Sequence, residues 1–183
     1  MTVAIVFSAC GIPSDARPRP LPAEDVPFGL LDPRSTTTAV AQPSVAAASA
    51  EIFLVAEERL APAPRQVPAP VSLEAVLAAL LAGPTVEEVA AGWRTAISAD
   101  TRLRSASTAD GIAHLDLSES FAEVEGEEQI LALAQLVFTA TALPGIRGVA
   151  FRLAGSAVEV PTADGTLKEA PIRRADFAAL GPT

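Results

Sequence analysis

A single histidine is the natural starting point in a search for catalytic residues. His114 lies two positions before Asp116. A serine hydrolase needs a histidine that takes the serine proton and a carboxylate that orients the histidine. Such a set would here require Asp116 and a distant serine. Side chains two positions apart on a strand share one face, where both compete for solvent. We therefore interpret His114 as a solvated or hydrogen-bonded strand residue, and a hydrolase remains only an alternative.

Two polar residues at the end of the same segment have a simpler interpretation. Asp116 and Ser118 follow the last apolar positions of a predicted strand. Short polar side chains at such places often accept hydrogen bonds from nearby backbone N–H groups. We expect them to shape the turn that leaves the strand, and we predict no catalytic residue in this chain.

The only cysteine suggests covalent modification. Cys10 stands in the run Ser8-Ala9-Cys10-Gly11 behind a short apolar stretch, a pattern that resembles the lipobox of bacterial lipoproteins. In that pattern a signal peptide is cut before the cysteine, which then carries acyl chains such as palmitate. Lipid attachment at Cys10 would fasten the rest of the chain to the outside of the cell membrane.

The residues before Cys10 are few for a secretory signal. Residues 1–9 contain no lysine or arginine, whereas a signal peptide has a basic start and a longer apolar stretch. We therefore expect a truncated or short signal peptide, with the true start codon further upstream. The alternative is a strand in which Val3, Ile5 and Phe7 alternate and Cys10 is a small buried apolar residue.

Neither a metal nor a cofactor is predicted. One histidine and one cysteine cannot supply the ligands of a zinc site. The acidic residues near position 125 lack the Asp/Asn-Gly spacing of a calcium loop; they are Glu123, Glu125, Glu127 and Glu128. Gly83-Pro84-Thr85 and Pro144-Gly145 mark helix ends, so we do not expect them to cradle phosphate.

The composition of the chain limits the classes of partner that it can bind. The net charge is −9, so the chain lacks the basic footprint that neutralises nucleic-acid phosphates. We expect no nucleic acid partner, and membrane contact only through the lipid. Half of the residues are hydrophobic, which is enough to build the core of one domain.

The chain divides into three parts. Residues 1–9 form the signal, and residues 10–48 form the lipidated cysteine with a proline-rich spacer. Seven prolines between positions 11 and 48 favour extended, semi-rigid chain. Residues 50–180 form the folded domain. An alternative for the spacer is partial docking on the domain through Phe28, Leu30 and Leu31.

Local patterns predict the first elements of the domain. Residues 51–56 are an apolar run typical of a strand. Residues 60–67 are also extended, but Pro62 and Pro64 place them at a sheet edge because proline cannot donate to a ladder. Ser72 is a good N-cap for an amphipathic helix that ends at Gly83-Pro84. Thr85 and Glu88 then form the capping box of a short helix.

Later patterns complete an α+β fold. Residues 101–107 and 112–117 flank Asp110-Gly111, a hairpin signal. A long helix follows, with Glu127 and Glu128 in its first turn and Pro144-Gly145 after its end. Residues 149–153 and 157–160 predict another hairpin, and residues 170–172 an edge strand. We expect a small mixed sheet of about five to six strands, with two main helices packed on one face.

The order of these motifs resembles the GerMN domain, which is named from sporulation and spore germination proteins and also occurs in actinobacterial lipoproteins. The resemblance covers residues 51–180. The segments that carry it are Leu80-Leu81-Ala82-Gly83-Pro84-Thr85, Gly92-Trp93-Arg94-Thr95-Ala96-Ile97, Asp110-Gly111, Leu115-Asp116-Leu117-Ser118, Gln135-Leu136-Val137-Phe138-Thr139 and Pro144-Gly145-Ile146-Arg147-Gly148-Val149. It implies a small α+β domain, an extracytoplasmic setting and a role in envelope assemblies without chemistry.

These observations predict a lipid-anchored extracytoplasmic protein that binds another component of the cell envelope. The alternative within the same class is a module that associates with itself in a ring or stack. Trp93, the single tryptophan, is either a core residue or part of an exposed contact patch.

Overall fold

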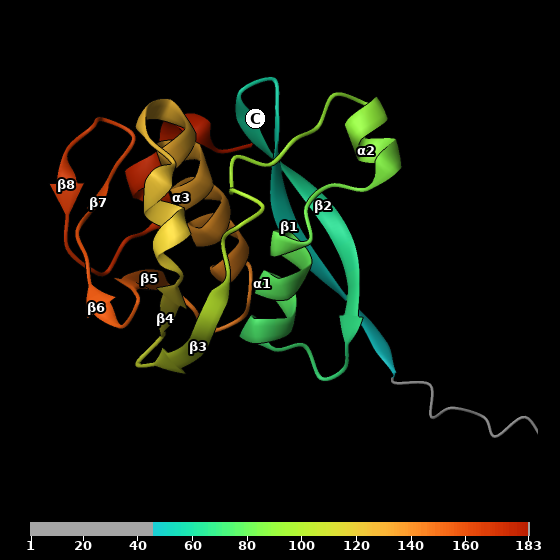
Figure 1. Ribbon diagram of the computed structural model, residues 1–183. Helices are drawn as coiled ribbons and strands as arrows, with labels where there is room; N and C mark the ends of the chain where they lie inside the picture. The colour runs from blue at the N-terminus through green and yellow to red at the C-terminus, as the bar shows by residue number, and fades with distance from the viewer. Residues whose placement is uncertain (1–45, 183) are drawn as a thin grey trace, which may run out of the picture. The chain divides into compact units, whose positions relative to one another are not determined.

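The computed structural model describes residues 46–182, which form an α+β fold (Figure 1). Strands β1 (Ala47–Ala56) and β2 (Arg59–Pro68) make a long antiparallel hairpin. A separate mixed sheet has the order β3-β4-β5-β6. Its members are β3 (Leu103–Ala109), β4 (Ile112–Leu117), β5 (Gly148–Leu153) and β6 (Ser156–Ala157). A third, two-stranded sheet pairs β7 (Val160–Pro161) with β8 (Leu167–Lys168).

The helices begin where the sequence predicts. Helix α1 (Leu73–Leu81) starts after Ser72, whose hydroxyl accepts a hydrogen bond from the Ala75 N–H at 3.2 Å. Helix α2 (Val86–Ala90) carries the full Thr85–Glu88 capping box. Helix α3 (Gly126–Ala140) has Glu127 and Glu128 in its first turn, where carboxylates favour the positive end of the helix dipole.

The central sheet is built around one tight turn and one crossover. Asp110 and Gly111 both have positive φ angles, which matches the twist of the β3–β4 hairpin. Strands β4 and β5 are parallel, so the chain must cross over between them, and α3 is that crossover. Helix α1 contacts α3 and β3, and α3 contacts β5, so both main helices cover the same face.

The core lies between this sheet and the two main helices. Alternation along β4 places three fully buried side chains toward the helices: Ala113, Leu115 and Leu117. The opposite parity directs His114 and Asp116 to the other face, as predicted. Phe177 belongs to the 3₁₀ segment η4 (Arg174–Leu180) and is also fully buried, although no local pattern had predicted this segment.

The predicted fold class is confirmed, and the strands divide differently. The mixed sheet has four strands, and the remaining strands of the described residues form two separate two-stranded sheets, the long β1–β2 hairpin and the short β7–β8 pair. Strand β1 begins at Ala47, four residues before the predicted start. The predicted edge strand at 170–172 is reduced to one bridge between Ile172 and Val149. Pro171 supplies no N–H to such a strand, which limits its pairing.

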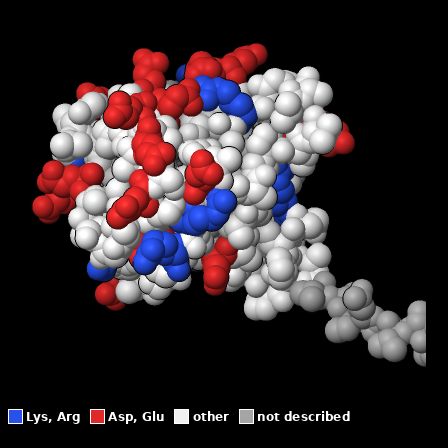
Figure 2. All heavy atoms as spheres, in the orientation of Figure 1, with Lys and Arg blue, Asp and Glu red and all other residues white. Residues whose placement is uncertain are grey.

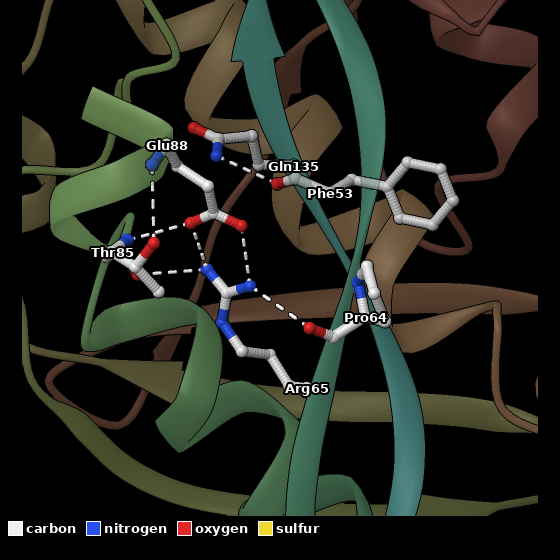
Figure 3. A network of polar contacts seen from close by, with 7 residues as sticks. Phe53, Pro64, Arg65, Thr85, Glu88 and Gln135 are labelled. Atoms are coloured by element: carbon white, nitrogen blue, oxygen red, sulfur yellow. Dashed lines mark hydrogen bonds and ion pairs between the residues drawn. The ribbon is translucent and has the colours of Figure 1, made fainter. Parts of the chain in front are cut away.

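The long hairpin is joined to the core by polar side chains of α3. The Phe53 carbonyl accepts a hydrogen bond from Gln135 Nε2 at 2.9 Å, which Figure 3 shows. The Phe53 N–H donates to Thr139 Oγ1 at 3.0 Å. Gln135 Oε1 also accepts from the Ala96 N–H at 2.8 Å. Gln135 and Thr139 are fully buried, so these contacts replace water for backbone groups that face the core.

We therefore expect Gln135→Leu to destabilise the fold by about 2–4 kcal/mol, because it leaves the Phe53 carbonyl and the Ala96 N–H buried without partners. Urea unfolding followed by circular dichroism measures the loss. Gln66→Leu is the matched control at an exposed position of β2 and should change stability by less than about 0.5 kcal/mol. Equal effects of the two substitutions would contradict this account.

Candidate functional site

The predicted lipid attachment site lies outside the described residues. Cys10 and residues 10–45 of the predicted spacer at 10–48 precede Ala46, the first residue that the structure describes. The last two residues of the predicted spacer, 47–48, belong instead to β1. Attachment of lipid at Cys10 therefore stays a prediction.

His114 and Asp116 share a shallow polar hollow on the face of the sheet away from the helices. The hollow measures about 310 Å³, and Ser107 and Arg152 also line it. Asp116 does not bond to His114. Its Oδ1 accepts from the Gly155 N–H at 2.9 Å, and its Oδ2 lies 3.4 Å from Arg104 Nε. The carboxylate thus holds the β5–β6 turn and does not orient the histidine.

Ser118 is occupied in the same way. Its hydroxyl accepts from the Arg102 N–H at 2.8 Å and lies 2.7 Å from the Ser120 hydroxyl. The Ser120 hydroxyl in turn donates to the Asp100 carbonyl at 2.9 Å. The predicted hydrogen bonds to backbone N–H groups are present, but their donors lie outside the turn that leaves the strand. Asp116 binds Gly155 in the β5–β6 turn, and Ser118 binds Arg102 just before β3.

One of the acidic residues near the start of α3, Glu128, forms an ion pair. Arg94 contacts Glu128 and Glu58 at 2.7 Å each and so links α3 to the β1–β2 turn. These two contacts outweigh partial burial and raise the pKa of Arg94, with the Glu128 hydrogen bond as the largest cause. Figure 2 shows acidic side chains along the upper margin of the visible face and also over its middle and left side.

Residues 46–182 contain neither a cluster of metal-ligating side chains nor a helix that could span a membrane. None of their His, Cys, Asp and Glu side chains form a group of three or more that could hold a metal ion. No helix in this part of the chain has the length and apolar character needed to cross a bilayer.

Trp93 is half-buried and packs against the core. It follows Gly92, whose φ of +84° turns the chain after α2. The backbone N–H of Trp93 donates to the Glu88 carbonyl at 2.9 Å. This packing shows that the Trp93 side chain is partly a core residue. A contact role for Trp93 stays a prediction.

An ion pair fixes α2 against the long hairpin (Figure 3). Arg65 on β2 contacts both oxygens of Glu88, with Nη1–Oε1 at 2.7 Å and Nη2–Oε2 at 2.6 Å. The side chains are only 15% and 18% exposed, and Glu88 also caps α2 through the Thr85 N–H. Hydrogen bonds from Arg65 lower the pKa of Glu88, against the opposing effect of partial burial. The ion pair and the cap therefore attach the short helix to β2 although none of its residues is buried.

An open groove of about 740 Å³ lies beside β1. One wall is the first half of β1, from Ser49 to Glu51, and Thr108 of β3 contributes to the lining. Val71, Leu73, Leu143 and Ile146 give the groove a largely aliphatic surface. Volumes of 300–1,000 Å³ with apolar walls are typical of binding sites.

Sequence reasoning did not find this groove. Its walls come from four segments that lie far apart in the sequence, and local patterns do not show which segments meet. One signal was available in the sequence. Ser49 and Glu51 alternate with alanines just before the apolar run, which is the pattern of a strand with one exposed face.

A family model described as Germane, sporulation and spore germination, matches residues 46–159. The chain belongs to this family. The match begins just before β1 and ends after β6, so it covers the long hairpin, the central sheet and the main helices. The GerMN resemblance predicted from the motifs is thereby confirmed.

Solved structures show the same fold for this Germane domain. The tandem GerMN domains of the sporulation protein GerM from Bacillus subtilis match with a TM-score of 0.57 and 23% identity. That match covers 76% of this chain and 49% of the tandem, so the chain spans about half the length of that relative. The first GerMN domain of the same protein matches with a TM-score of 0.54 and 25% identity, over 70% of this chain and 98% of that domain. No curated protein matches the chain.

We expect Glu88→Gln to lower stability by about 1–2 kcal/mol at pH 7, because glutamine keeps the capping geometry and loses the ion pair. The lowered pKa of Glu88 means that this contribution is present above the ordinary carboxyl pKa of 4.5 and disappears as the pH falls through the folded-state value. Urea unfolding of both proteins between pH 3 and pH 7 tests this.

The wild-type and Glu88→Gln proteins should therefore converge in stability toward pH 3. Glu57→Gln, in the exposed β1–β2 turn, is the matched control. A stability difference that does not change with pH would show that the ion pair contributes little.

Proposed function

We propose that this Germane-domain protein is a lipid-anchored extracytoplasmic module that binds another component of the cell envelope without catalysis. The groove beside β1 carries this proposal, because its volume of about 740 Å³ is typical of binding sites and its lining is mainly aliphatic. By contrast, Asp116 and Ser118 are engaged in contacts that hold turns. The geometry therefore favours recognition over bond making.

The anchor would act by confinement. Acyl chains at Cys10 would hold the domain at the membrane surface and raise its effective concentration for partners there. A single acyl chain binds membranes only marginally, so two or three chains on the cysteine would be needed for stable attachment. The proline-rich segment after Cys10 would serve as the spacer.

The family name supports the biological setting. The family is described by sporulation and spore germination, and the matching GerM is a sporulation protein. We infer an analogous role for this chain in an envelope process of that kind, with an envelope protein as partner.

Replacement of the cysteine tests the anchor. Wild-type protein should fractionate with membranes, and mass spectrometry should find acyl chains on Cys10 as the new N-terminal residue. Cys10→Ser protein should lose the acyl mass and move to the soluble fraction. A combined variant carries His114→Ala, Asp116→Asn and Ser118→Ala. It should remain with membranes and support the same cellular phenotype as the wild-type protein in cells whose own gene is deleted.

An unmodified sulfur on native cytosolic protein would overturn the anchor. Loss of the phenotype in the combined variant, with the fold retained by circular dichroism, would instead favour the hydrolase alternative.

Self-association is the second candidate function. The matched GerM structure holds GerMN domains in tandem, and this chain spans 49% of it, so two copies would reproduce its domain number. In that case the mass measured by sedimentation equilibrium should rise with concentration toward a dimer or larger ring. If the mass stays that of a monomer up to about 1 mM protein, the free energy of self-association is weaker than about 4 kcal/mol. Binding of a different protein would then remain the proposed function.

A further inference from the structure

Along β1, the backbone groups of alternate residues face β2 on one edge and the rest of the domain on the other edge. Both the N–H and the carbonyl of Phe53 bond to side chains of α3, so they point away from β2. Val55 does the same toward Arg94, with two hydrogen bonds of 2.9 Å. Alternate residues of a strand direct their backbone groups to the same edge. Ser49 and Glu51 therefore present their N–H and carbonyl groups on this edge as well.

At Ser49 and Glu51 this edge borders the groove. Both residues line it, and both are exposed. No backbone or side-chain group within residues 46–182 forms a hydrogen bond with their N–H or carbonyl groups. Two donors and two acceptors thus stand in a row along one wall of an apolar hollow.

The other edge of the hairpin is closed by its sequence. Pro62 and Pro64 lie opposite Phe53 and Glu51, at the positions of β2 whose backbone faces outward. Proline has no N–H there, so this edge cannot complete a ladder with a further strand. The hairpin consequently has one edge that resists strand addition and one short stretch that remains able to accept it.

The side chains around the open stretch define what fits. Val71, Leu73, Leu143 and Ile146 favour apolar side chains directed into the groove. Glu51 is exposed and forms no ion pair within the described residues. The nearby Arg174 is held elsewhere, because it donates to Thr141 Oγ1 at 2.7 Å and stacks on Phe138.

We propose that the β1 edge at Ser49 and Glu51 binds an extended segment of a partner protein as an added strand, with alternate apolar side chains in the groove and a basic side chain beside Glu51. Main-chain hydrogen bonds would hold the segment, and the pockets for alternate side chains would select it. The inference rests on the proposed binding function and assigns its site.

A proline pair tests the backbone contacts. Ser49 and Gln66 face each other, and the N–H of each points outward from the hairpin, on opposite edges. Ser49→Pro removes a donor from the groove edge, and Gln66→Pro removes the matching donor from the closed edge. The probe is a fluorescein-labelled peptide of alternating valine and threonine with a central arginine, titrated into the full chain by fluorescence anisotropy.

We expect Ser49→Pro to weaken the peptide at least tenfold, whereas Gln66→Pro and Ser49→Ala change its affinity less than twofold. Glu51→Gln should weaken it severalfold and reduce the salt dependence. In the unsubstituted chain, peptide should slow the amide hydrogen exchange of Ser49 and Glu51 at least tenfold, which tests the proposal without any variant.

Equal loss of affinity in the two proline variants would overturn the proposal. Slow exchange of both amides in the dilute free chain would also overturn it, since a second copy or the chain's own residues 1–45 would then fill the edge. If the peptide fails to bind while Cys10 carries lipid and the protein fractionates with membranes, the groove assignment falls, whereas the proposed anchor and the envelope location stand.

Discussion

The structure depends on how the buried part of the β1 edge is satisfied. A two-stranded ribbon is marginal alone in water and gains stability when it packs against a helix. Packing removes water from the backbone groups on that side, and each such group needs a new partner. Gln135 and Thr139 supply these partners from one face of α3, where residues four apart are neighbours. The long hairpin is thereby fixed to the core by these side chains, together with the backbone pair of Val55 and Arg94, in place of a full third strand.

This arrangement explains which parts of the fold could be predicted. Caps and tight turns are set by residues within four positions of each other, so Ser72, the Thr85–Glu88 box and Asp110-Gly111 lie where the sequence indicates. The division into three sheets depends on pairing between distant segments, for which a single sequence carries no local signal. Gln135 falls among apolar residues in an amphipathic pattern, and its buried amide has meaning only once Phe53 is placed beside it.

The candidate site was predictable only in part, for a related reason. Alternation along β4 was enough to place His114 and Asp116 on one face. The short polar side chains of Asp116 and Ser118 at the strand end indicated that they bind backbone N–H groups. Neither signal revealed that Asp116 reaches Gly155, 39 residues away. The groove was missed altogether, because Val71, Thr108 and Leu143 belong to three segments whose meeting follows from the packing of α1 and α3. Hydrogen bonds of side chains at strand and helix ends can thus be predicted from the sequence. A groove cannot, because its walls meet only in the assembled fold.

The groove and the proposed anchor are energetically suited to each other. A net contribution of about 0.5–1.5 kcal/mol for each main-chain hydrogen bond gives the four groups of Ser49 and Glu51 only a few kcal/mol. The ordering of an extended segment opposes that gain, so an added strand at this short edge would bind weakly from free solution. Confinement of both partners to one membrane surface removes much of the cost of bringing them together. A short, selective edge is then sufficient, whereas a longer open edge would invite unselective pairing of the kind that Pro62 and Pro64 prevent on β2.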